Sequence, residues 1–490
     1  MQAPATLAEA KWFRAGSIAF LLGVVAVFAY TGTYLWLVFP FAYLFVLLMG
    51  LNWKLAWWVL LFTIPISMQL EFMGNALSAA LPDEPIMWLF FLLFPILWAR
   101  RPDSLPRWWW RNSIVFVLVL QFMWLIVATA FSQELFLSIK YLISRTWLEV
   151  VFFIFPIWIF TTKKDFKRAF LIVLVPLLLT MMVIMIKHRA IGYSFYKLKF
   201  AIGIIYDNHV DYSTVMSMFF PLLLIAYSLC RGKWLLRNII LVLIAFFLVA
   251  IYLTYARAAM LAVVFSLVVY VMIRMKIVKW LMPAIYGLMA VLLVYMISDK
   301  KYLDYRPNYN NTYMHKTFAE HMIATLRGTD MSSMERIYRW IAGVRMSTDH
   351  PLVGVGPNAF YYYYKPYAVT SFRTYVSRNT EHSTTHNYFL YMLVEQGWPA
   401  MILYAILLMV MFAQAQKTYH RFHDRFYKKV TIGIAMLLAA SFVNNFFSEL
   451  LGHHKVGALF YLGLGLLVVL DKKSRDEEAR LKSGDTTELP

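Results

Sequence analysis

Residues 163–187, KKDFKRAFLIVLVPLLLTMMVIMIK, decide the fold of this chain. Four basic residues in the first six positions precede eighteen residues without a charge, from Ala169 to Ile186. A helix needs about 20 mostly apolar residues to cross a bilayer, and Lys and Arg collect in short cytoplasmic loops. The stretch therefore predicts one membrane-spanning helix that begins on the cytoplasmic side.

The same pattern recurs along the chain and predicts an all-α polytopic membrane protein. We expect about 12–14 transmembrane helices and one large, partly helical periplasmic loop. The apolar runs are 16–31, 34–51, 54–70, 85–99, 112–131, 141–160, 169–187, 209–230, 237–256, 258–274, 280–298, 387–413, 430–448 and 456–470.

Composition excludes a water-soluble protein. Of the 490 residues, 61% are hydrophobic and 15% are charged, against about 45–50% and about 25% in soluble domains. The single cysteine, Cys230, excludes an intramolecular disulfide and a cysteine metal cluster.

The net charge of +20 is mostly a topological signal. When the spans alternate, 27 of the 46 Lys and Arg residues fall on one side, which places both termini in the cytoplasm. Because these residues are scattered through short cytoplasmic loops, we do not expect a nucleic acid as partner. Membrane lipids are expected to surround the spans.

Four regions follow from this topology. They are an N-terminal helix bundle (1–298), a periplasmic loop domain (299–386), the C-terminal transmembrane helices (387–470) and a charged cytoplasmic tail (471–490).

The loop domain contains a candidate anion-binding helix. Ser332-x-x-Glu335 is a capping box, so we expect a helix from Ser332 to the Asp349-His350-Pro351 segment. Arg336 and Arg339 would share one face of it, and two guanidinium groups there suit a phosphate or pyrophosphate. The alternative is a solvated basic helix whose arginines pair with Glu335 or Asp349.

Two further features of the loop allow more than one interpretation. Gly354 and Gly356 either form a tight turn or let the backbone approach a ligand closely. The tyrosines of 361–364 either stack on sugar rings or lie at the membrane interface.

His386 lies where the loop enters the next span. An imidazole with a pKa near 6.5 can accept a proton from a hydroxyl at neutral pH. His382 lies four residues earlier, but no third ligand is evident, so we do not predict a metal site. Glu395, within the span, is expected to be functional or hydrogen-bonded to a neighbouring helix.

Other charged residues gather at the same outward level. Arg257 needs a carboxylate or a bound anion as partner, and Arg145 is expected at the same depth. The last outward turn adds Glu449, His453, His454 and Lys455.

The order of these motifs resembles the O-antigen ligase and Wzy-type polymerase superfamily of lipid-linked glycan transferases. The motifs, in chain order, are Ala256-Arg257-Ala258-Ala259, Glu335-Arg336-x-x-Arg339-Trp340, His350-Pro351-Leu352-x-Gly354-x-Gly356-Pro357-Asn358-x-Phe360, His386-Asn387-Tyr388-x-Leu390 and Glu395-x-Gly397.

The resemblance implies a GT-C-like glycosyltransferase of the bacterial inner membrane with a periplasmic active site. The donor would be a glycan on undecaprenyl pyrophosphate. The acceptor would be lipid A-core in a ligase or a lipid-linked repeat unit in a polymerase. His386 would be the base, and Arg257, Arg336 and Arg339 would bind the pyrophosphate. Supporting roles would fall to His382, Glu395, Gly354, Gly356 and Arg145.

Two alternatives to an inverting, metal-independent transfer are less favoured. No Asp-x-Asp occurs in the chain, which argues against a metal-dependent transferase, and we expect no cofactor. A transporter for the same lipid would show inverted repeats and charges along many spans, whereas here the polar residues concentrate at the outward mouth.

Overall fold

The structure is a computed structural model that describes residues 7–32, 36, 38–72, 77–100, 105–305, 323, 330–374, 377–378 and 383–483. The chain divides into two compact units, Met1–Phe62 and Thr63–Pro490. Throughout the described ranges the protein is helical apart from one two-stranded sheet.

The first unit consists of α1 (Leu7–Thr31) and most of α2 (Val38–Thr63). Asn52 interrupts α2 with non-helical backbone angles (φ −153°, ψ 82°). The predicted apolar runs 34–51 and 54–70 meet at this break.

A β-hairpin opens the second unit and shortens the predicted run 54–70. After a 3₁₀ turn at Ile64–Ile66, β1 (Met68–Phe72) pairs antiparallel with β2 (Leu77–Leu81), with Met68 opposite Leu81. Backbone pairing between strands replaces the helix here, a change that hydrophobicity alone does not signal.

Long helices follow the hairpin. Their bounds are α3 (Asp83–Arg100), α4 (Arg107–Trp110), α5 (Ser113–Ala130), α6 (Leu135–Glu149), a π-turn (Val150–Ile154), α7 (Pro156–Ile159), α8 (Lys163–Ala190), α9 (Leu198–Ile202), α10 (His209–Leu229), α11 (Trp234–Leu253), α12 (Arg257–Arg274), α13 (Val278–Ile297), η5 (Ser298–Tyr305), α15 (Met331–Asp349), α16 (Phe360–Tyr363), η6 (Lys365–Tyr367), η7 (Thr370–Phe372), α17 (Tyr388–Arg421), α18 (Arg425–Phe446), η8 (Leu450–Gly452) and α19 (His454–Lys482).

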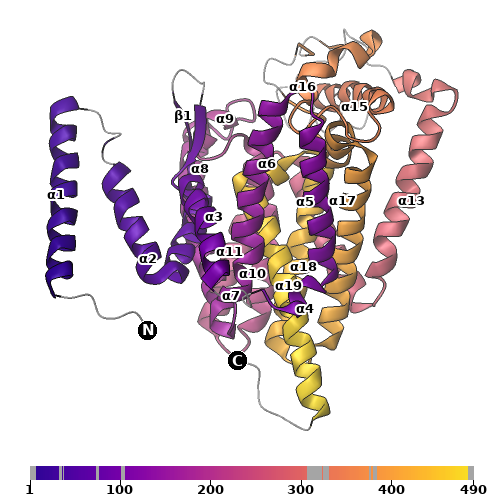
Figure 1. Cartoon of the computed structure of the whole chain (residues 1–490). Coiled ribbons are helices and arrows are strands. Elements are labelled where there is room, and N and C mark those ends of the chain that lie inside the picture. Colours follow the sequence, from indigo (N-terminus) through magenta and orange to yellow (C-terminus); the bar gives the residue numbers. More distant parts are fainter. Residues whose placement is uncertain are drawn as a thin grey trace. The chain divides into compact units, whose positions relative to one another are not determined.

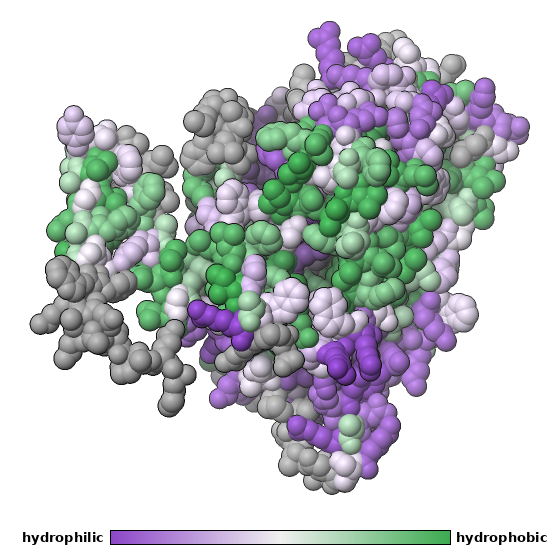
Figure 2. Space-filling view, in the orientation of Figure 1, coloured by the Kyte–Doolittle hydropathy of each residue, from purple (hydrophilic) through white to green (hydrophobic). Residues whose placement is uncertain are grey.

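In the described part of the chain, eleven helices are long and apolar enough to cross a membrane. The predicted runs 16–31 and 85–99 also form helices, in α1 and α3, but their apolar parts are shorter. Figure 2 shows a hydrophobic belt over the second unit between hydrophilic ends. The protein is therefore an all-α polytopic membrane protein.

Burial distinguishes central from peripheral helices. The apolar window of α19 is 94% buried and that of α18 is 78% buried, against 11% for α13. The last two helices of the chain, α18 and α19, thus form the centre of the second unit.

The two ends of the second unit differ in what they carry. Helices α15 and α16 cover one end, which we call the loop end, whereas α4 and the last turns of α19 lie at the other (Figure 1). Residues 471–482, predicted as part of a charged tail, continue α19 as helix. Asp471 is buried there because Arg421 and Arg475 pair with it at 2.8 and 2.6 Å.

Candidate active site at the loop end

A small hydrophobic core holds the loop end together. Phe360 and Tyr364 stack with ring centroids 4.9 Å apart and are fully buried. They pack with Tyr338, Ala342 and Met346 of α15 and with Val394 of α17. Neither sugar stacking nor a place at the membrane interface describes Tyr364, because its side chain is buried in this core. Tyr362, in contrast, is exposed.

The segment 351–360 is fastened to a break in α17, and we call this contact the α17 joint. Gly397 interrupts the helix at φ +79°, and a Cβ on it would lie 1.8 Å from the carbonyl oxygen of Leu352. A Cβ on Gly354 would lie 2.4 Å from the carbonyl carbon of Glu395. Both positions require glycine because backbone fills the space of a side chain.

Glu395 completes the α17 joint from inside. Its side chain is fully buried and accepts hydrogen bonds from the backbone N–H groups of Asn358 (2.5 Å) and Phe360 (3.2 Å). Gly356, at φ +116°, packs against Ser132 so closely that a Cβ would overlap the serine hydroxyl. Glu395, Gly354 and Gly356 therefore make the contacts of a folded turn. Of the two interpretations of the glycines, these contacts agree with the tight turn.

The arginines predicted to bind pyrophosphate meet at one place together with His386. We call Arg257, Arg336, Arg339, His386 and the carboxylates of Asp330, Glu335 and Glu449 the cationic mouth. Arg257 begins α12 and its Nη2 lies 3.0 Å from Oδ2 of Asp330. The same carboxylate caps α15, accepting from the N–H of Ser333. The prediction of Ser332 as the capping residue is therefore wrong by two positions, because the carboxylate of Asp330 accepts the capping hydrogen bond.

Arg336 and Arg339 differ in how they are bonded. Arg339 is buried and pairs with Glu335 at 3.4 Å, and it also donates to the carbonyl of Thr384. Arg336 forms no ion pair within the described residues, and its buried Nε, like that of Arg339, has no hydrogen-bond partner. Burial, and next the charge of Arg257, lower the pKa of Arg336 to about 10, so it remains a cation at neutral pH. Arg339 therefore follows the alternative in which the arginines of this helix pair with a carboxylate. Arg336 suits the alternative in which they bind an anion.

His386 is held at the mouth in a left-handed backbone conformation (φ +51°). The next residue, Asn387, caps α17, and Trp340 of α15 donates its indole N–H to the carbonyl of Thr385 at 2.8 Å. The Nδ1 atom of His386 lies 3.6 Å from Oε1 of Glu449. The side chain of His386 is about one-third exposed.

Burial and the neighbouring arginines keep this imidazole neutral. Burial lowers the pKa of His386, the charge of Glu449 raises it, and Arg336 and Arg339 lower it again, to about 4. A neutral imidazole can accept a proton at physiological pH. The contact between Glu449 and His386 was not predicted from the sequence, since it joins positions 63 apart.

Arg145, a predicted supporting residue, is bonded to residues outside this group. Arg145 pairs with Glu149 at 2.7 Å, donates to the hydroxyl of Tyr388 and lies over the ring of Tyr461, all among packed helices. Its partner Tyr388 lies two residues after His386 in the chain. His382 lies outside the described residues.

Comparison with known families agrees with these motifs. Residues 239–405 match the family model described as O-antigen ligase. The match covers about a third of the chain and includes Arg257, Arg336, Arg339, His386 and the α17 joint, but neither Arg145 nor Glu449. The comparison with curated proteins finds no match. The match supports the O-antigen ligase and Wzy-type polymerase superfamily, whose members use lipid-linked glycans, and with the apolar helices it indicates a multi-pass bacterial membrane protein.

Proposed function

Because residues 239–405 match the O-antigen ligase family, we propose that this protein is a glycosyltransferase of the inner membrane with a periplasmic active site. It moves a glycan from undecaprenyl pyrophosphate to an acceptor hydroxyl. We assign it as an O-antigen ligase whose acceptor is lipid A-core. The transfer is inverting and uses His386 as base without a metal ion.

The observation that supports this proposal is the convergence of a neutral histidine with three arginines. A pyrophosphate leaves readily only if the charge that develops on it is neutralised, which fixed guanidinium groups do well. Arg336 is suited to this role because, unlike Arg257 and Arg339, it forms no ion pair with a described carboxylate. Arg257 lies close enough to lower the pKa of Arg336, so the two cations act on one region.

The proposed step balances as a single displacement. The acceptor hydroxyl gives its proton to Nε2 of His386 while its oxygen forms a bond to the anomeric carbon. The bond between that carbon and the pyrophosphate oxygen breaks, and its electron pair leaves with the phosphate, beside the arginines. Glu449, near Nδ1, stabilises the imidazolium that forms.

Donor binding should also make the base stronger. Arg336 and Arg339 lower the pKa of His386. A bound pyrophosphate would compensate their charge, so the pKa of His386 would rise toward neutrality in the complex with donor. The mouth would then hold a neutral base before binding and a more basic one afterwards.

The direct test is transfer by the purified protein from the lipid-linked donor to lipid A-core. His386→Asn tolerates the left-handed backbone better than alanine, yet it cannot act as the base. We expect a loss of about 10²–10⁴-fold in transfer, with an unchanged melting temperature. His350→Asn is the matched control, because His350 lies in the same loop domain and bonds to Gln133 outside the mouth. Transfer at the wild-type rate by His386→Asn would overturn the assignment of the base.

A deletion strain distinguishes the two acceptors. Loss of all attached polymer, with lipid-linked polymer accumulating, supports the ligase. A surface lipid carrying a single repeat unit would overturn that assignment in favour of a repeat-unit polymerase with the same chemistry.

A further inference from the structure

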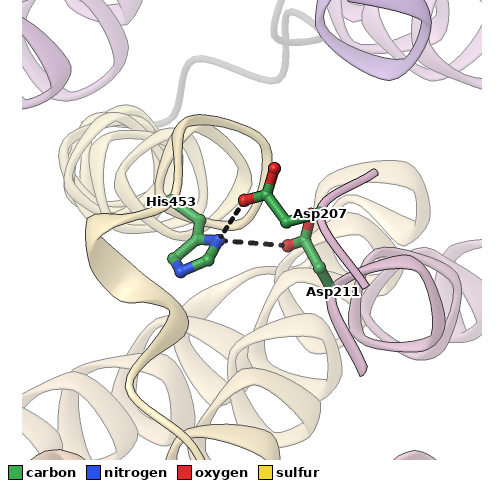
Figure 3. A group of neighbouring side chains, drawn as sticks. All are labelled: Asp207, Asp211 and His453. Carbon is green, nitrogen blue, oxygen red and sulfur yellow. Dashed lines mark ion pairs between the residues drawn. The ribbon is translucent and has the colours of Figure 1, made fainter. Parts of the chain in front are cut away.

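Three ligand-type side chains converge outside the cationic mouth (Figure 3). Asp207 precedes α10, Asp211 lies in its first turn, and His453 immediately precedes α19. The Nδ1 atom of His453 lies 3.0 Å from Oδ2 of Asp207 and 3.9 Å from Oδ1 of Asp211. All three ligand atoms lie within 4.8 Å of one another.

One oxygen of the buried Asp211 carboxylate has no hydrogen bond to a described residue. Its side chain is only 2% exposed, and its buried Oδ1 has no hydrogen-bond partner. The closer carboxylate, Asp207, takes the single proton that Nδ1 of His453 could offer. A buried carboxylate oxygen without a donor is costly, and this one faces the other two ligand atoms.

The charge around the cluster is also incompletely balanced. The carboxylates of Asp83, Asp207 and Asp211 all act on Lys455, whose ammonium is bonded to the carbonyl oxygens of Pro65, Ser67 and Ile205. Three carboxylates thus face one ammonium, and a bound cation would offset their negative charge further.

We propose that Asp207, Asp211 and His453 form a site for a divalent transition-metal ion, with zinc as the best fit. One imidazole nitrogen and two carboxylate oxygens are a ligand set that zinc accepts. Ligands at about 2.0–2.1 Å from a tetrahedral zinc lie about 3.4 Å from one another. The observed separations of 3.0 and 3.9 Å bracket that value.

The position of the site suggests what the ion does. Asp207 is 38% exposed, which leaves an entry path and room for a water ligand. The ion would tie the start of α10 to the turn before α19. That turn, η8, directly follows Glu449, so the ion would fix the segment that positions Glu449 beside His386. No step of the proposed transfer passes through it.

The test is zinc binding to the full-length protein, purified in detergent and stripped with a chelator. Isothermal titration with ZnCl₂ should show one ion per chain. Because zinc competes with protons for its ligands, its binding should weaken as the pH is lowered.

Variants assign the ligands. Asp207→Asn and His453→Gln alter partly exposed side chains, so the fold should survive, and each should weaken zinc binding at least about tenfold. Asp349→Asn is the matched control, because Asp349 is a loop-end carboxylate that accepts a hydrogen bond from the hydroxyl of Tyr367 at its Oδ2 atom. Absence of zinc binding by the wild type, or equal binding by Asp207→Asn, would overturn the site and leave a plain histidine–aspartate ion pair.

Discussion

The α17 joint and the cationic mouth both lie at the loop end but are bonded in opposite ways. In the joint, backbone fills the space at Gly354 and Gly397, and Glu395 accepts two backbone N–H groups. In the mouth, Arg336 keeps a buried Nε without a partner, and Oε2 of Glu449 is likewise unbonded. A satisfied region stabilises the fold, whereas an unsatisfied one is available to a ligand.

The largest expected effect follows from breaking the joint. In Gly397→Ala the new Cβ would overlap the carbonyl of Leu352, in a left-handed conformation that alanine disfavours. We expect a loss of at least about 3 kcal/mol in the free energy of unfolding. The measurement is the melting temperature in detergent. Gly287→Ala, on α13 with open space around it, is the control and should melt as the wild type does.

The next effect separates two arginines of the mouth. Arg336→Lys removes the planar fork at the arginine that forms no ion pair within the described residues, so we expect donor KM to rise about ten- to a hundredfold with little change in melting temperature. Arg339→Lys should instead lower the melting temperature, since Arg339 holds Glu335 and the carbonyl of Thr384. The reverse pattern would assign Arg339 to the donor and Arg336 to the fold.

The smallest effect is a shift in pH dependence. His386 must be neutral to act as base, and its pKa near 4 should keep kcat/KM level down to about pH 5. In Glu449→Gln the stabilising carboxylate is gone, so the pKa falls and the acid limb moves to lower pH. In Arg336→Gln a cation is gone, so the limb moves to higher pH, each by about one unit.

These opposite shifts require a pH–rate profile of the free enzyme for each variant. Identical limbs in all three proteins would show that His386 does not control the reaction. The same profile in Asp349→Asn provides a control for loss of an acidic side chain at the loop end.

The membrane architecture was accessible from hydrophobicity and basic residues because lipid constrains each span by itself. The 163–187 stretch forms α8 from Lys163 to Ala190. The hairpin at 68–81 was not, since strand pairing depends on a partner. The end of α15 at Asp349 was predicted from the following proline, but its N-cap at Asp330 was not predicted.

The candidate site divides in the same way. The sequence by itself determined that Arg257, Arg336, Arg339 and His386 belong to one group of motifs. Only the tertiary structure decided that Arg339 is paired, that Arg145 is buried elsewhere, and that Glu449 faces His386. The reason is physical, because the pairing and burial of a charged residue at a helix end depend on the groups that surround it. Asp207, Asp211 and His453 meet only when α10 packs beside α19, which no local pattern records.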